Sequence, residues 1–129
     1  MTKQNRHRLA AVPALIIGLL SVKEGGSVLL GLSTKTYPVL PWLVWYNVVM
    51  GLVSVAAGAG LWMQRREGSM LAAVILLCHG IVLLGLLALF LSGTAIARIS
   101  IMAMVFRTAV WLVISLVLKG KSGRQDSTA

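Results

Sequence analysis

The sequence predicts an all-α membrane protein, built as an antiparallel bundle of four transmembrane helices. Hydrophobic residues make up 58% of the 129-residue chain and charged residues only 12%, whereas soluble domains carry about 25% charged residues. The polar residues are therefore too few to coat a soluble protein of this size. The apolar residues also fall into four long segments joined by short connectors. Short connectors make consecutive helices neighbours that run in opposite directions.

The predicted spans cover residues of about 9–33, 42–63, 70–92 and 99–118. Each span is long enough to cross a hydrocarbon core of roughly 30 Å at a rise of about 1.5 Å per residue. Together they form one domain, residues 1–118. We expect the polar tail that follows, residues 119–129, to be disordered.

The first span differs from the others because Lys23, Glu24, Gly25 and Gly26 interrupt its apolar run. Adjacent residues on a helix point about 100° apart, so the two charges cannot face one partner while the helix is straight. Freed backbone groups are tolerated in a membrane where they line a polar cavity. We therefore expect the first helix to be broken or kinked at Gly25-Gly26, with the charges delivered to the interior of the bundle.

Lysine and arginine are distributed unevenly over the predicted connectors and termini. Two of them lie on one side, Lys35 and Arg98, and eight lie on the side of the termini: Lys3, Arg6, Arg8, Arg65, Arg66, Lys119, Lys121 and Arg124. The positive-inside rule then predicts a plasma-membrane protein with both termini, and the tail, in the cytoplasm. These charges account for most of the net charge of +9, and they form no basic stripe interleaved with aromatic residues, so nucleic-acid binding is not expected.

Five polar residues fall inside the spans and make up the candidate ligand-binding or proton site: Lys23, Glu24, Asn47, His79 and Arg107. Helix rise places all five in the middle-to-outer part of the bundle. A lone charge there costs about 2.5–3.5 kcal/mol on insertion scales, so we expect Glu24 to pair with Arg107. The remaining positive charge would be balanced by a quinone carbonyl or an anionic lipid.

The same residues have structural explanations that the sequence leaves open. A buried pair of Glu24 and Arg107 can be a folding clamp or a contact to a partner subunit. His79 can hydrogen-bond a neighbouring helix without any role in ligand or proton binding.

Catalytic and metal chemistry have little support in the sequence. The chain has one cysteine, Cys78, and its histidine and acidic residues are too scattered for a metal-ligand cluster. No nucleophile lies in a pattern with a base, so no catalytic residue is predicted and no cofactor is identified. A pocket that contains Glu24, His79 and Arg107 could still transfer protons.

The second and third spans resemble the DoxX-like membrane proteins in the stretch "GLVSVAAGAGLWMQRREGSMLAAVILL". Gly51 and Gly58, followed by Arg65 or Arg66, match that family's glycine-rich second span and short basic loop. The chain departs from the family at Ser54, where an acidic residue is common. The resemblance implies a four-helix protein of the bacterial inner membrane, sometimes linked to quinone or redox systems. It carries no catalytic residue over, and small residues at this spacing also favour close helix packing.

Three functions from different classes fit these observations. The first is an accessory or binding protein whose polar pocket holds a quinone-like or anionic ligand, or a polar residue of a partner membrane subunit. The alternative is a small proton-coupled transporter, in the form of a homodimer, that uses Glu24 as its ion site. A membrane enzyme is the least supported of the three.

Overall fold

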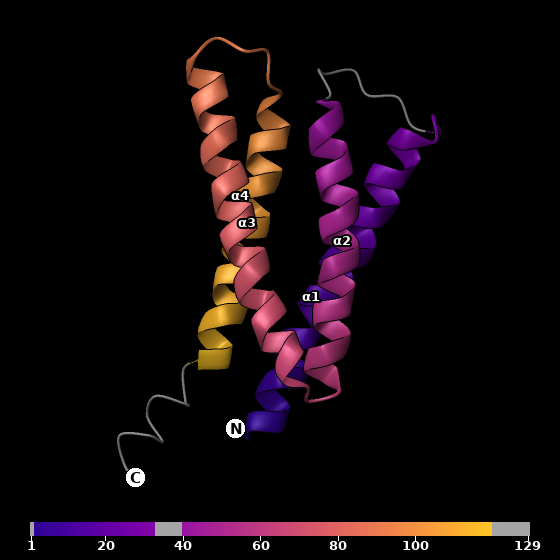
Figure 1. Ribbon diagram of the computed structural model, residues 1–129, viewed down its shortest axis with the longest axis vertical. Coiled ribbons are helices and arrows are strands. Elements are labelled where there is room, and N and C mark those ends of the chain that lie inside the picture. The colour runs from indigo at the N-terminus through magenta and orange to yellow at the C-terminus, as the bar shows by residue number, and fades with distance from the viewer. Residues whose placement is uncertain (1, 33–39, 120–129) are drawn as a thin grey trace.

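The computed structural model describes residues 2–32 and 40–119, and this part of the chain is all-helical. It contains α1 (Lys3–Leu29), α2 (Pro41–Trp62), α3 (Arg66–Leu91) and α4 (Arg98–Lys119), shown in Figure 1. All four helices are long and apolar enough to cross a membrane, which confirms the four predicted apolar helices. The predicted tail lies outside the described residues, apart from Lys119 at the end of α4.

The first helix begins and ends earlier than the apolar run suggests. The Thr2 hydroxyl accepts a hydrogen bond from the Asn5 backbone N–H at 3.1 Å. This N-cap lets α1 begin at Lys3 rather than near residue 9. At the other end, Gly31 has a left-handed φ of +74°, which glycine adopts without steric cost and which commonly ends a helix. The last helical residue is therefore Leu29 rather than residue 33.

Of the break or kink expected at Gly25-Gly26, the break is wrong, because α1 is one continuous helix through both glycines. The kink stays a prediction. Gly25 lies against α2, where an added Cβ would collide with the Val48 side chain. Gly18 and Gly51 approach each other in the same way, since a Cβ on Gly18 would lie 2.8 Å from the Gly51 carbonyl oxygen. Glycine is thus needed for close contact between the two helices. The packing role expected of the small residues on the second span is confirmed.

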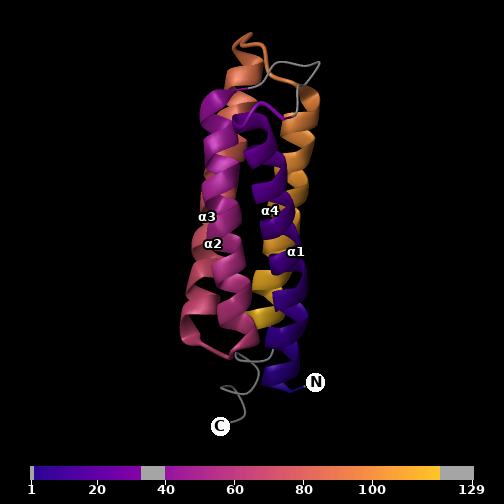
Figure 2. The ribbon, with the colours of Figure 1, turned by 90° about the vertical axis from the view of Figure 1, so that its right-hand side faces the viewer.

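The helices contact one another in chain order, and α4 also contacts α1. The contact between α1 and α2 is the most extensive. In Figure 1 the α3–α4 pair separates from α2, and the separation grows toward the end of the molecule where α1 ends. Figure 2 shows the four helices side by side along one axis, with the start of α1 and the end of α4 at the same end.

The main core lies where all four helices meet. It includes Ala11, Leu61, Ile75 and Trp111, one from each helix, and none of these four side chains has exposed surface. A smaller apolar cluster lies near the end of the molecule that holds the start of α2 and the end of α3. It consists of Leu43, Leu86, Ile96 and Met104. The small alanine side chains of α1 leave room for the large Trp111 indole.

Large apolar side chains also cover the outer faces of the helices. Leu19, Leu52, Leu84 and Phe106, again one from each helix, are all more than half exposed. Soluble proteins seldom expose this many large apolar side chains. Such exposure suits helices whose outer faces contact lipid.

Candidate functional site

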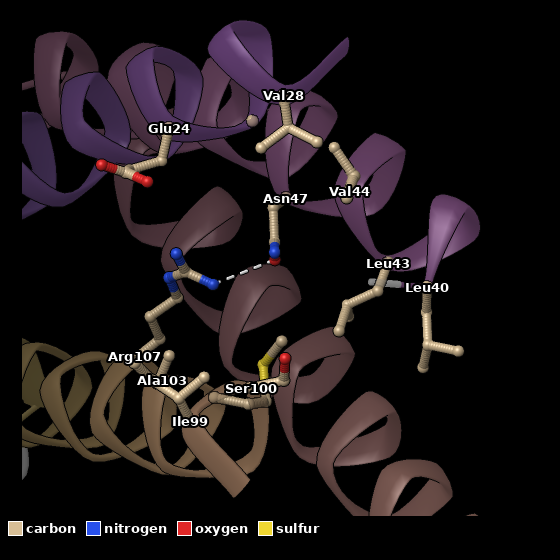
Figure 3. A pocket seen from close by; sticks show the side chains of 12 residues that line it. Glu24, Val28, Leu40, Leu43, Val44, Asn47, Ile99, Ser100, Ala103 and Arg107 are labelled. Carbon is tan, nitrogen blue, oxygen red and sulfur yellow. Dashed lines mark hydrogen bonds between the residues drawn. The ribbon is translucent and has the colours of Figure 1, made fainter. Parts of the chain in front are cut away.

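A cavity of about 300 Å³ lies between α1, α2 and α4, toward the end where α3 and α4 lean away from α2 (Figure 3). We call it the Arg107 cavity. Each of the three helices contributes one strongly polar residue to its wall: Glu24 from α1, Asn47 from α2 and Arg107 from α4. The rest of the lining is mostly apolar and consists of Gly25, Val28, Leu40, Leu43, Val44, Ile99, Ser100, Ala103 and Met104.

Arg107 and Asn47 are joined across the cavity by a direct hydrogen bond. The Arg107 guanidinium donates through Nη1 to Asn47 Oδ1 at 3.0 Å, and both side chains are half-buried. A guanidinium carries five N–H donors, and this bond uses one of them. The bond links α4 to α2 and fixes the direction in which the guanidinium points.

Glu24 extends into the same cavity from α1 (Figure 3). Its carboxylate is close enough to attract the Arg107 guanidinium electrostatically. The structure therefore brings together three of the five predicted site residues, Glu24, Asn47 and Arg107. The predicted pairing of Glu24 with Arg107 stays a prediction, because the hydrogen bond described here joins Arg107 to Asn47.

Lys23 lies apart from this group. Its side chain is exposed and is not part of the lining of the Arg107 cavity. The Lys23 backbone carbonyl accepts a hydrogen bond from Ser27 Oγ at 2.7 Å, as in an ordinary helical turn. Because α1 is continuous, Lys23 and Glu24 point about 100° apart. The structure separates Lys23 from the other predicted site residues for this reason.

His79 is buried on α3, with 2% of its surface exposed, and it lies outside the lining of the Arg107 cavity. Its Nδ1 shares a hydrogen bond of 2.7 Å with the hydroxyl of Tyr46 on α2. The two rings also meet edge to face, with centroids 5.7 Å apart. The alternative that His79 hydrogen-bonds a neighbouring helix is confirmed. Its partner Tyr46 was missed, although a tyrosine inside an apolar span needs a partner for its hydroxyl.

Arg6 was also missed, because its charge was assigned to the topology signal. The side chain is only 5% exposed. Its Nη1 donates to the backbone carbonyls of Val117 at 3.2 Å and Leu118 at 3.4 Å, in the last turn of α4. The signal that could have revealed it is the spacing of Arg6, Ala10 and Ala14, which share one face of α1 and are all buried.

The polar wall of the Arg107 cavity can recognise a ligand through hydrogen bonds and charge. The described residues include no group of three histidine, cysteine or acidic side chains that could hold a metal ion. The polar wall offers the guanidinium and amide of Arg107 and Asn47 as donors, and the Glu24 carboxylate as an acceptor. A polar group attached to an apolar body matches this combination of walls.

Comparisons with protein-family models, with curated proteins and with solved structures find no match to this chain. The resemblance to the DoxX-like proteins therefore stays a prediction.

Proposed function

We propose that this chain is a small multi-pass protein of the bacterial inner membrane that binds a quinone-like head group in the Arg107 cavity. In this proposal the four helices span the membrane as an antiparallel bundle, with both termini in the cytoplasm. The observation that carries the proposal is the Arg107–Asn47 pair inside a cavity of about 300 Å³ whose other walls are mostly apolar.

The membrane part of the proposal is supported by two properties of the helices. All four are long and apolar enough to span a bilayer. Their outer faces carry large exposed apolar side chains, such as Leu77 and Leu116, that water would solvate poorly. The bias of lysine and arginine toward the end that holds the start of α1 supports the orientation.

The polar wall favours a neutral acceptor over an anion. Arg107 and Asn47 can donate hydrogen bonds to a quinone carbonyl, while the ring contacts side chains such as Val44 and Ala103. A fully anionic head group would be attracted by Arg107 but repelled by the Glu24 carboxylate on the opposite wall. The cavity lies at the lower end of the usual size range for ligand sites, which runs from about 300 to 1,000 Å³.

The direct test is binding of a short-tailed benzoquinone to the purified protein in mild detergent, measured by calorimetry. We expect Arg107→Gln to weaken binding by about tenfold, the equivalent of one lost charge-assisted hydrogen bond. Arg98→Gln is the matched control, because it removes an exposed arginine of the same helix that does not line the cavity. Unchanged binding in Arg107→Gln would overturn the proposal.

A second variant separates loss of binding from loss of folding. Ala103→Phe puts a larger side chain into the cavity from α4 without removing either partner of the Arg107–Asn47 bond. We expect this variant to unfold at the same temperature as the parent and to bind the quinone much more weakly. Full binding in Ala103→Phe would show that the quinone lies elsewhere.

The alternative proposal is a proton-coupled transporter with Glu24 as the ion site, supported by the position of Glu24 in a cavity. A transporter needs access to this carboxylate from both sides of the membrane. The main core, with Leu61, Ile75 and Trp111, lies between the Arg107 cavity and the other end of the helices. Proteoliposomes that contain a pH-sensitive dye decide between the two: proton flux that Glu24→Gln abolishes would favour the transporter.

A further inference from the structure

A second cavity, of about 540 Å³, lies at the opposite end of the molecule. The start of α1, the connection between α2 and α3, and the end of α4 come together there (Figure 1). We call it the basic cavity. Its charged lining comes from three places: Lys3 on α1, Arg65 and Arg66 at the start of α3, and Lys119 at the end of α4.

The basic cavity has cationic side chains without acidic ones in its described lining. Four lysine and arginine residues line it, and no aspartate or glutamate is among the described residues of its wall. The nearby Glu67 contacts Arg65 at 3.8 Å, but both side chains are more than half exposed. An exposed pair of this kind is weak in water. The accumulated positive charge therefore favours an anion in the cavity.

Two buried side chains in the same wall also carry a polar atom that has no hydrogen-bond partner within the described residues. His7 on α1 is 7% exposed and Ser115 on α4 is 8% exposed, and both line the cavity. Within the described part of the chain, His7 Nδ1 and Ser115 Oγ make no hydrogen bond. Buried polar groups in folded proteins are nearly always hydrogen-bonded. Because both residues line the basic cavity, a group bound there is placed to supply the missing hydrogen-bond partner.

The wall that carries these groups is held in place by Arg6. Its guanidinium donates to the Val117 and Leu118 carbonyls and so joins the start of α1 to the end of α4. His7 and Ser115 therefore belong to two helices that are fixed relative to each other. A site whose donors are fixed in advance loses less entropy when it binds a ligand.

We propose that the basic cavity binds a phosphate group. Phosphate oxygens accept hydrogen bonds from histidine and serine, and they are the usual partners of clustered arginine and lysine. The proposal is independent of the Arg107 cavity, because the two cavities share no lining residue. Two sources can supply this group, the head group of an anionic lipid or free inorganic phosphate, and basic pockets at the cytoplasmic ends of transmembrane helices are suited to lipid head groups.

The test uses native mass spectrometry of the purified full chain in a neutral detergent. Its three probes are dioleoyl phosphatidylglycerol, inorganic phosphate, and dioleoylglycerol as the matched lipid without phosphate. We expect a bound phosphate-containing probe and no bound dioleoylglycerol. Retention of phosphatidylglycerol alone identifies a lipid phosphate, and binding of inorganic phosphate that displaces the lipid identifies free phosphate. Equal binding of dioleoylglycerol, or binding of no probe, overturns the proposal.

Variants locate the bound group. Ser115→Ala removes a hydroxyl that makes no hydrogen bond within the described residues, and Arg66→Gln removes one charge at an exposed position, so both are expected to fold. Each should weaken binding of the retained probe on the order of tenfold. Arg98→Gln removes a charge at the other end of α4 and should bind as the parent does. Equal weakening in Arg98→Gln, or full binding in both cavity variants, would show that the probe does not occupy this cavity.

Discussion

The two cavities at opposite ends of the molecule differ in whether their polar side chains are hydrogen-bonded within the described part of the chain. In the Arg107 cavity an acid, a base and an amide face one another, and Arg107 is hydrogen-bonded to Asn47 within the chain. In the basic cavity the charged side chains are all cationic, and His7 Nδ1 and Ser115 Oγ have no partner among the described residues. The first site holds a hydrogen bond between its own residues, whereas we propose that a phosphate group from outside the chain completes the second. Mutations at the first site should therefore affect stability as well as ligand binding, whereas mutations at the second should affect ligand binding with little change in stability.

The largest expected effect concerns which side of the membrane each cavity faces. In a Cys78→Ala background, Thr94→Cys marks the end near the Arg107 cavity and Glu67→Cys marks the end near the basic cavity. Both positions are exposed. A membrane-impermeant maleimide added to intact cells should label Thr94→Cys and leave Glu67→Cys unlabelled, because the positive-inside rule places the basic end in the cytoplasm. The reverse pattern would invert the proposed orientation, and opening the cells should expose both cysteines.

The next effect tests the internal pairing in the Arg107 cavity. Asn47→Leu removes the acceptor of a half-buried guanidinium, and we expect it to lower the free energy of unfolding by about 2–3 kcal/mol. Arg107→Leu should have a cost of similar size. The double variant should recover much of the loss, because it leaves neither a guanidinium without its acceptor nor an amide oxygen without its donor at this bond. Unfolding in detergent mixtures measures the cycle, and strictly additive losses would contradict the coupling.

A smaller loss is expected at the Tyr46–His79 bond, which is buried but uncharged. Tyr46→Phe removes the hydroxyl and leaves His79 Nδ1 without its partner. We expect a loss of about 1–2 kcal/mol in the free energy of unfolding, because the buried nitrogen is no longer satisfied. Quinone binding should change little, since neither residue lines the Arg107 cavity. A large loss of quinone binding with unchanged stability would assign this pair to the ligand site instead.

The smallest effect is expected at Ser115 and completes the comparison. In lipid-free detergent, Ser115→Ala removes a hydroxyl that has no partner within the described residues. The free energy of unfolding should change by less than about 0.5 kcal/mol, or rise slightly, because no internal hydrogen bond is lost. Thermal unfolding of the delipidated protein measures this. A destabilisation comparable to that of Asn47→Leu would show that Ser115 is bonded within the chain after all.

The helices themselves were predictable because apolar length is a strong local signal. All four elements were expected. Three ends were misplaced by more than one residue: the start of α1, where Thr2 caps the helix, the end of α1, before Gly31, and the start of α3 at Arg66. The continuity of α1 through Gly25-Gly26 was not predictable from composition, since glycine serves both for bending and for close contact. Only the position of Val48 on α2 shows which of the two applies here.

Part of the candidate site was predictable, because charged and strongly polar residues inside a membrane span need a partner. That argument selected Glu24, Asn47 and Arg107, which the structure brings into one cavity. It also included Lys23 and His79, because the sequence does not show which way each side chain points around its helix. The hydrogen-bond partners of His79 and Arg107 could not be predicted for the same reason.

The contact between Arg6 and the end of α4 has a consequence for the order in which the helices come together during synthesis. The ribosome adds Arg6 to the chain long before it adds Val117 and Leu118, whose carbonyls accept the hydrogen bonds. The two acceptors lie 111 and 112 positions after Arg6. Any growing chain that has not yet reached those residues holds a guanidinium that cannot be satisfied in the way the finished fold satisfies it. Because the acceptors are backbone atoms, the hydrogen bonds from Arg6 do not depend on which side chains occupy positions 117 and 118. Covariation between position 6 and the end of α4 would therefore be weak, although the contact joins the earliest and latest parts of the helical region.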